Sequence, residues 1–345
     1  MRLLFGIIDC GTTNTRVYIL NNRNQKIGQG ERRVGVRNTS MTGSKDALRQ
    51  GVCEAVAEAA KSAGIEVRDL SFVIASGMIT SEIGLKEIPH LVAPVGLREL
   101  TEGVEAVAAG EVIPIDVPVL FVRGVRNDYG EAILKNIRNV DFMRGEETQV
   151  IGILEEFNVK EPLNIIVLSS HTKLIHVDAN GRIAASLTSL SGQLYEAICK
   201  ESMIGKSLAE NHSEKSGGYS FNEIVDTAAE VVGEVGLDRG IMIPRFLQVL
   251  LQTDSNERNL FMDAAVAADD MGLVQEFEHQ GYHADRYILF GHEARCNVYS
   301  YLLNKQFGEK IDVTCVSDKE RQSELTIRGA VTIANSYMKL QKEKK

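Results

Sequence analysis

One pattern occurs twice in the chain and constrains its fold more than any other: an apolar strand, a small polar turn and a second strand. The first copy spans residues 3–20 and turns at Gly11-Thr12-Thr13-Asn14. The second spans residues 163–178 and turns at Ser169-Ser170-His171-Thr172. A third strand is predicted after each hairpin, over residues 26–33 and 182–187. Each half then alternates helices with short buried strands, so the sequence predicts two similar α/β domains with a cleft between them.

The pattern restarts near Glu161-Pro162, so we expect an N-terminal domain over residues 1–160 and a C-terminal domain over residues 161–345. In the first domain, hydrophobic periodicity predicts helices over residues 45–63, 97–109 and 144–156, and strands over residues 72–75 and 117–122. In the second domain it predicts strands over residues 287–290 and 311–316, and helices over residues 192–200, 221–233, 244–252, 255–270, 273–280, 294–304 and 320–340.

Composition narrows the classes of partner. The net charge of -9 argues against an open surface for nucleic acid or for an anionic membrane. The five cysteines include no C-x-x-C pair, and an odd number without a secretory signal favours a reducing compartment, so a cytoplasmic protein is expected. Asp9 interrupts the apolar start, which therefore predicts a strand and not a signal peptide, and no apolar run is long enough to span a bilayer.

The first turn favours a particular chemistry. A turn of glycine and threonine brings backbone N–H groups and hydroxyls close to whatever lies above it, and such groups suit phosphate oxygens. Asp9 alone would repel phosphate, but Mg²⁺ takes one or two carboxylates together with phosphate oxygens. The segment Asp9 to Asn14 therefore fits a Mg²⁺–nucleotide site, while an ordinary hairpin turn with Asp9 as a turn former is the simpler alternative. No Walker A pattern is present in the sequence.

Several motifs resemble a known family. The run from Asp9 to Arg16 resembles the first phosphate motif of the actin-like ATPase and sugar kinase superfamily. Asp141-Phe142-Met143-Arg144-Gly145-Glu146-Glu147-Thr148-Gln149 resembles the signature of the 2-dehydro-3-deoxygalactonokinase family, and Gly77-Met78 is similar to its glycine-methionine segment. The resemblance implies two actin-like (ribonuclease H-like) domains with a cleft between them. It also implies that ATP phosphorylates 2-dehydro-3-deoxy-D-galactonate, or a close 2-keto-3-deoxy acid, at the 6-hydroxyl.

The resemblance assigns residues to the two substrates. It implies that the N-terminal domain carries the first phosphate hairpin and the sugar-acid site, and that the C-terminal domain carries the nucleotide site. Asp9 is expected to hold Mg²⁺. His171 and Lys173 are separated by one residue on a strand, so their side chains point to the same face. That face could line the cleft; the alternative is that His171 is a hydrogen-bonded structural histidine. The residues implied for ATP are Asp9, Gly11, Thr12, Thr13, Asn14, Ser169, Ser170, His171, Lys173 and Gly291, and those implied for the sugar acid are Arg16, Gly77, Met78 and Arg144.

Three carboxylates are candidates for the catalytic base. Related sugar kinases place a glycine and an acid at a helix start facing the cleft, and Gly145-Glu146 stands in the similar place. Asp141 and Glu147 are the alternatives for the base. Acidic residues are also common at helix starts because the helix dipole favours them. Arg144 is expected to take the carboxylate of the acid in a bidentate pair, or else to form a surface salt bridge.

Other functions stay open at the level of the sequence. Ser169-Ser170 replaces the Gly-Thr that the family carries before His171, and Gln193 replaces a glutamate. These changes favour an alternative, a sugar-acid or nucleotide sensor of the same fold that has lost catalysis. An actin-like or chaperone-type ATPase would need insertions for which 345 residues leave little room. The expected partners are a sugar acid and ATP, with no nucleic acid and no membrane, and a homodimer stays open.

Overall fold

The computed structural model describes residues 4–131, 133–158, 160–209 and 218–344. The chain packs into two compact units. Unit 1 contains the chain up to Glu161 together with Asp178–Ser186 and the segment from Ser323 onward, and unit 2 contains Pro162–Val177 and Leu187–Gln322. Each unit is built on its own sheet, so each is described separately.

Unit 1 has a six-stranded sheet of order β3-β2-β1-β4-β7-β6, and a small sheet of order β5-β8-β9. The strands are β1 (Phe5–Cys10), β2 (Thr15–Leu20), β3 (Lys26–Arg32), β4 (Phe72–Gly77), β5 (Leu91–Val92), β6 (Glu105–Val107), β7 (Val119–Phe121), β8 (Val125–Arg126) and β9 (Phe142–Met143). The helices are α1 (Val36–Thr42), α2 (Asp46–Ser62), α3 (Leu97–Glu102), α4 (Glu146–Phe157) and α11 (Lys319–Glu343), of which α11 enters the unit at Ser323.

The pairing of β1 with its two neighbouring strands in unit 1 brings the first turn and the end of β4 to one edge of the sheet. β1 pairs antiparallel with β2, so that Cys10 faces Thr15, and parallel with β4, so that Cys10 also faces Gly77. The first turn and the end of β4 therefore lie at the same edge of the sheet. Buried side chains of β1, β4 and α2, such as Ile8, Val73 and Val52, form the core beneath that edge.

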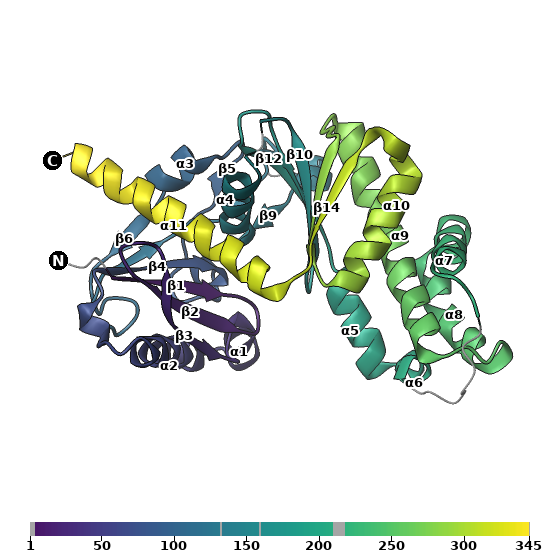
Figure 1. Cartoon of the computed structure of the whole chain (residues 1–345), viewed down its shortest axis with the longest axis horizontal. Helices are drawn as coiled ribbons and strands as arrows, with labels where there is room; N and C mark the ends of the chain where they lie inside the picture. The colour runs from purple at the N-terminus through teal and green to yellow at the C-terminus, as the bar shows by residue number, and fades with distance from the viewer. Residues whose placement is uncertain (1–3, 132, 159, 210–217, 345) are drawn as a thin grey trace. The chain divides into compact units, whose positions relative to one another are not determined.

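Unit 2 repeats the plan with a five-stranded sheet of order β12-β11-β10-β13-β14. Its strands are β10 (Leu163–Leu168), β11 (Thr172–Val177), β12 (Ile183–Ser189), β13 (Arg286–Gly291) and β14 (Asp312–Val316). Its helices are α5 (Ser191–Glu201), α6 (Met203–Ala209), α7 (Phe221–Val235), α8 (Leu237–Leu250), α9 (Ser255–Gln280) and α10 (Glu293–Phe307). β10 pairs antiparallel with β11 and parallel with β13, as β1 does with β2 and β4. Figure 1 shows the helices α7, α8, α9 and α10 of this unit.

The predicted fold class is confirmed, because both sheets open with a three-strand meander and continue with parallel strands. Packing does not follow a single cut near residue 160, however. Val95 bridges Ile183, and the Asn127 side chain bonds the backbone of Ser186, so the start of β12 packs in unit 1. The final helix, α11, also returns to unit 1 (Figure 1). Gly152 of α4 and Gly329 of α11 let the backbones of these two helices touch.

The bounds of several predicted helices were wrong. The helix predicted over residues 97–109 ends at Glu102, because Gly103 follows and residues Glu105–Val107 pair with β7 as a strand. The two helices predicted over residues 255–270 and 273–280 are one helix, α9, which passes through Gly272 without a break. Among the described residues, no helix is long and apolar enough to cross a membrane.

Candidate functional site

The first turn presents unused hydrogen-bond donors. The Gly11 N–H donates to the Asn14 carbonyl over 2.9 Å, which closes the turn. Within the described residues, the N–H groups and side chains of Thr12, Thr13 and Asn14 make no hydrogen bond, and Thr13 is exposed. Polar donors that are free and partly accessible suit a ligand rich in acceptor oxygens. Binding of phosphate by this turn stays a prediction.

A glycine at the start of a helix packs against each hairpin turn. In unit 1, a Cβ on Gly35 would lie 2.5 Å from the Gly11 carbonyl oxygen, and the Arg37 N–H donates to the Thr12 carbonyl over 2.9 Å. In unit 2, a Cβ on Gly192 would lie 2.1 Å from the Ser169 carbonyl oxygen. Neither position can take a larger residue without moving its turn. The sequence signal for Gly35 is a glycine between the third strand of the meander and a helix, and the prediction from sequence missed it.

The start of α4 lies against the end of β4. Gly145 has φ +113° and Gly77 has φ +90°, so both adopt backbone conformations that favour glycine. A Cβ on Gly145 would lie 3.3 Å from the Cα of Gly77, so the two segments are close. The predicted substrate residues Gly77 and Met78 and the predicted base Glu146 are thus brought together within unit 1.

Asp9 and Glu146 interact electrostatically. The Asp9 side chain is 28% exposed, and its nearest cationic atom is Arg16 Nη1, at 3.8 Å. Partial burial raises the pKa of Asp9, the charge of Arg16 opposes that increase, and the negative charge of Glu146 adds to it. Two carboxylates that repel each other beside this turn are an arrangement that a divalent cation would stabilise.

The other two carboxylates have different environments. Glu147 is fully buried; its Oε2 accepts the Gly145 N–H over 2.7 Å, and its Oε1 has no hydrogen-bond partner among the described residues. Burial, and then the charge of Glu146, raise the pKa of Glu147 to about 8. Asp141 is buried too, and its Oδ1 accepts the Phe142 N–H over 2.6 Å. Of the three candidates for the base, only Glu146 has a partly exposed side chain.

The predicted substrate arginines are both engaged within unit 1. Arg144 is half-buried, and its guanidinium donates to Thr80 Oγ1 and to the Ile88 carbonyl, each over 2.8 Å. Arg16 donates to Glu31 over 3.2 Å and is 43% exposed. Arg144 thereby ties the signature segment to the chain that follows Met78. A role of either arginine in binding the sugar acid stays a prediction.

The second turn differs from the first in its side chains. Ser169 and Ser170 are exposed, and Ser170 Oγ lies 3.2 Å from His171 Nδ1. Lys173 is 5% exposed, and its Nζ donates to Thr188 over 2.6 Å. Gly291 ends β13 directly beside Leu168, the last residue of β10. The predicted nucleotide residues of unit 2 therefore lie at one sheet edge, with Lys173 buried beneath the turn.

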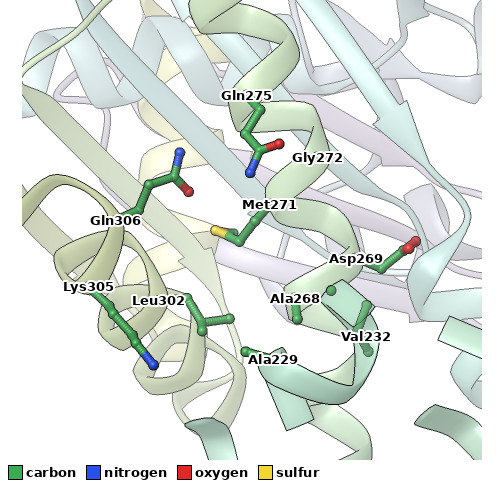
Figure 2. Close-up of a pocket in the computed structure, with 11 residues that line it drawn as sticks. Ala229, Val232, Ala268, Asp269, Met271, Gly272, Gln275, Leu302, Lys305 and Gln306 are labelled. Atoms are coloured by element: carbon green, nitrogen blue, oxygen red, sulfur yellow. The ribbon is translucent and has the colours of Figure 1, made fainter. Parts of the chain in front are cut away.

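A separate hollow of about 400 Å³ lies between α7, α9 and α10, and it contains none of the predicted site residues. Figure 2 shows small residues such as Ala229, Ala268 and Gly272 along its walls. Lys305 at its rim is paired with Asp226, whose Oδ1 lies 2.6 Å away. Among the described residues, no group of three or more His, Cys, Asp or Glu side chains forms a metal cluster.

The repeated sheet order and the two hairpin turns define an α/β fold in which each of the two units opens with a three-strand meander. A family model described as 2-keto-3-deoxy-galactonokinase matches residues 9–330, and the chain belongs to that family. The chain is 22% identical over 226 residues to a Rhizobium meliloti (strain 1021) protein named "Probable 2-dehydro-3-deoxygalactonokinase DgoK1". The alignment covers 66% of each of the two chains, just under two thirds.

A solved structure supports the fold. The crystal structure of a Sinorhizobium meliloti protein assigned as a 2-dehydro-3-deoxygalactonokinase aligns with a TM-score of 0.70. The alignment covers 96% of this chain and 98% of that one, at 19% sequence identity. At this level of identity the comparison shows the fold, and the roles of single residues rest on the geometry described above.

Proposed function

We propose that this protein transfers the γ-phosphoryl group of ATP to the 6-hydroxyl of 2-dehydro-3-deoxy-D-galactonate or of a close 2-keto-3-deoxy acid. The membership of the family supports the reaction class. The observation that carries the proposal is the placement of Asp9 and Glu146, two mutually repelling carboxylates, beside a turn with free donors.

In the proposed reaction, the oxygen of the 6-hydroxyl forms a bond to Pγ, and the bond from Pγ to the bridging oxygen of ADP breaks. The proton of the hydroxyl goes to a carboxylate, and we assign that role to Glu146 because it is the accessible member of the three candidates. The free N–H groups of Thr12 to Asn14 would hold phosphate oxygens. In unit 2, the turn at Ser169-Ser170 and the start of α10 after Gly291 are proposed to bind the nucleotide.

The residues of unit 1 fit a magnesium ion. Asp9 would hold it, because its carboxylate is partly exposed and its salt bridge to Arg16 is long, with Arg16 Nη1 at 3.8 Å. Mg²⁺ requires few protein ligands, since it keeps waters and takes phosphate oxygens, so the lack of a larger cluster among the described residues does not count against it. When bound, Mg²⁺ supplies charge neutralisation for the transferred phosphoryl group.

Three matched variants test the assignment of the base. Glu146→Gln keeps the shape of the side chain and removes the base, so kcat should fall on the order of 10²–10⁴-fold while both substrates still bind. Asp141→Asn and Glu147→Gln, which alter the two buried carboxylates, should retain most of the turnover. If Glu146→Gln keeps a near-normal kcat, the base is another group.

A further inference from the structure

A buried polar network lies directly behind the second turn. Asp270 of α9 accepts hydrogen bonds from Tyr299 and from Ser189, each over 2.5 Å. Thr172, the first residue of β11, shares a 2.6 Å hydrogen bond with Ser191 and lies 3.4 Å from the Tyr299 hydroxyl. Asp270, Tyr299 and Thr172 are each at most 3% exposed. The network joins α9, α10, β11, β12 and α5 at the edge where the turn ends.

Arg295 connects this network to the turn itself. Its Nη1 donates to the Ser169 carbonyl over 3.1 Å. Its Nη2 donates to Thr172 Oγ1 over 3.1 Å and to the Tyr299 hydroxyl over 3.3 Å. The guanidinium also lies 5.7 Å from the centre of the Tyr299 ring. One planar group therefore holds both ends of the turn, at Ser169 and at Thr172.

The position of Arg295 in the chain relates it to the nucleotide residues. It lies in the first turn of α10, four residues after Gly291. Asp263 of α9 is the acidic neighbour of its guanidinium: burial raises the pKa of Asp263 to about 6, and the positive charge of Arg295 opposes that increase. The charge of Arg295 is thus partly balanced within the protein, and its hydrogen bonds are directed at the turn.

We infer that Arg295 is a positioning residue, which holds the Ser169–Thr172 turn in the conformation that receives the phosphates of the nucleotide. This inference rests on the proposed function of unit 2. A lysine could not replace it, because one ammonium cannot reproduce the planar fork that donates to a carbonyl and two hydroxyls. A misplaced turn should weaken nucleotide binding without changing the binding of the sugar acid.

The test measures MgATP affinity by calorimetry in the absence of sugar acid, so that it does not depend on turnover. Arg295→Ala should bind MgATP roughly 10- to 100-fold more weakly than the wild type, the range expected when a phosphate loses about one hydrogen bond to a well-placed donor. Millimolar guanidinium should restore part of the affinity, and methylammonium should not. The matched control is Arg245→Ala, which removes an arginine of α8 that bonds Gln248 in the same unit.

Two further variants keep the inference testable if Arg295→Ala fails to fold. Arg295→Lys retains the charge, and Tyr299→Phe removes only the hydroxyl that joins Asp270, Thr172 and Arg295. Both should weaken MgATP binding, Tyr299→Phe less than Arg295→Lys. Wild-type affinity in these variants would overturn the inference. If the wild-type protein binds MgATP but transfers no phosphate, the proposed function is contradicted. The MgATP titrations of the variants still test the role of Arg295 in nucleotide binding in that case.

Discussion

Glu147 allows a prediction whose magnitude follows from its environment. Its pKa is raised from 4.5 to about 8 because the carboxyl is fully buried and lies near Glu146. Between those two pH values the folded chain retains a proton that the unfolded chain releases. The free energy of unfolding should therefore fall as the pH rises from 4.5 to about 8, and this contribution should be constant above that range.

Glu147→Gln removes this titration and keeps an acceptor for the Gly145 N–H. At about 1.4 kcal/mol per pH unit, the span from 4.5 to about 8 corresponds to an upper limit of about 5 kcal/mol. We expect roughly half of that, because water and local rearrangement reduce the cost of a buried charge. Relative to the wild type, the variant should thus gain about 2–3 kcal/mol in stability between pH 5 and pH 8.

The assay is urea denaturation of both proteins at a series of pH values from 5 to 9. Subtracting the free energy of unfolding of the wild type from that of the variant cancels the titration of groups that the two proteins share. Glu155→Gln, which changes an exposed glutamate of the same helix, serves as the control and should give a flat difference. If the Glu147→Gln difference also stays constant within about 0.5 kcal/mol, the size of an ordinary surface effect, Glu147 is not held protonated and the reasoning is refuted.

Three other perturbations test the site. Asp9→Ala should keep the fold and lose the stabilisation that MgATP gives. It should lower kcat and kcat/KM together, by a factor that corresponds to several kcal/mol of lost transition-state stabilisation. Full activity, measured as ADP release, would show that Asp9 is not in the magnesium site. Arg144→Lys should lower the melting temperature, because the contacts with Thr80 and Ile88 are lost. It should also weaken sugar-acid binding by roughly 2–5 kcal/mol if the ion pair with the substrate is buried. A lower melting temperature with an unchanged KM would show that Arg144 has a structural role only. Gly35→Ala should disrupt the first turn and reduce MgATP affinity, because its Cβ would overlap the Gly11 and Thr12 carbonyls; wild-type affinity would show that the turn can shift without cost.

The sequence predicted the elements whose pattern is local. The two hairpins could be predicted because apolar runs flank turns of small polar residues, and each strand begins and ends within a few residues of its predicted range. The start of α4 was likewise marked by Gly145 and two acidic residues. The same local pattern misled at residues 97–109, where Gly103 separates a helix from a strand of similar composition.

The sequence could not predict features that depend on tertiary packing. β5, β8 and β9 have two residues each, too few to show a period of two. Glu146 and Glu147 look alike in the sequence, and only the packing of α4 buries one and leaves the other partly exposed. Arg295 carries no motif, because the turn residues that it contacts, Ser169 and Thr172, are 126 and 123 residues away in the chain.

The most direct test of the proposed function is the release of ADP by the wild-type protein with ATP, Mg²⁺ and a panel of six-carbon 2-keto-3-deoxy acids. We predict ADP release that requires both the metal ion and the acid, fastest with 2-dehydro-3-deoxy-D-galactonate, and a product whose phosphate is on the 6-hydroxyl. If the protein binds MgATP but no acid of the panel stimulates ADP release, the account of a sugar-acid kinase is contradicted.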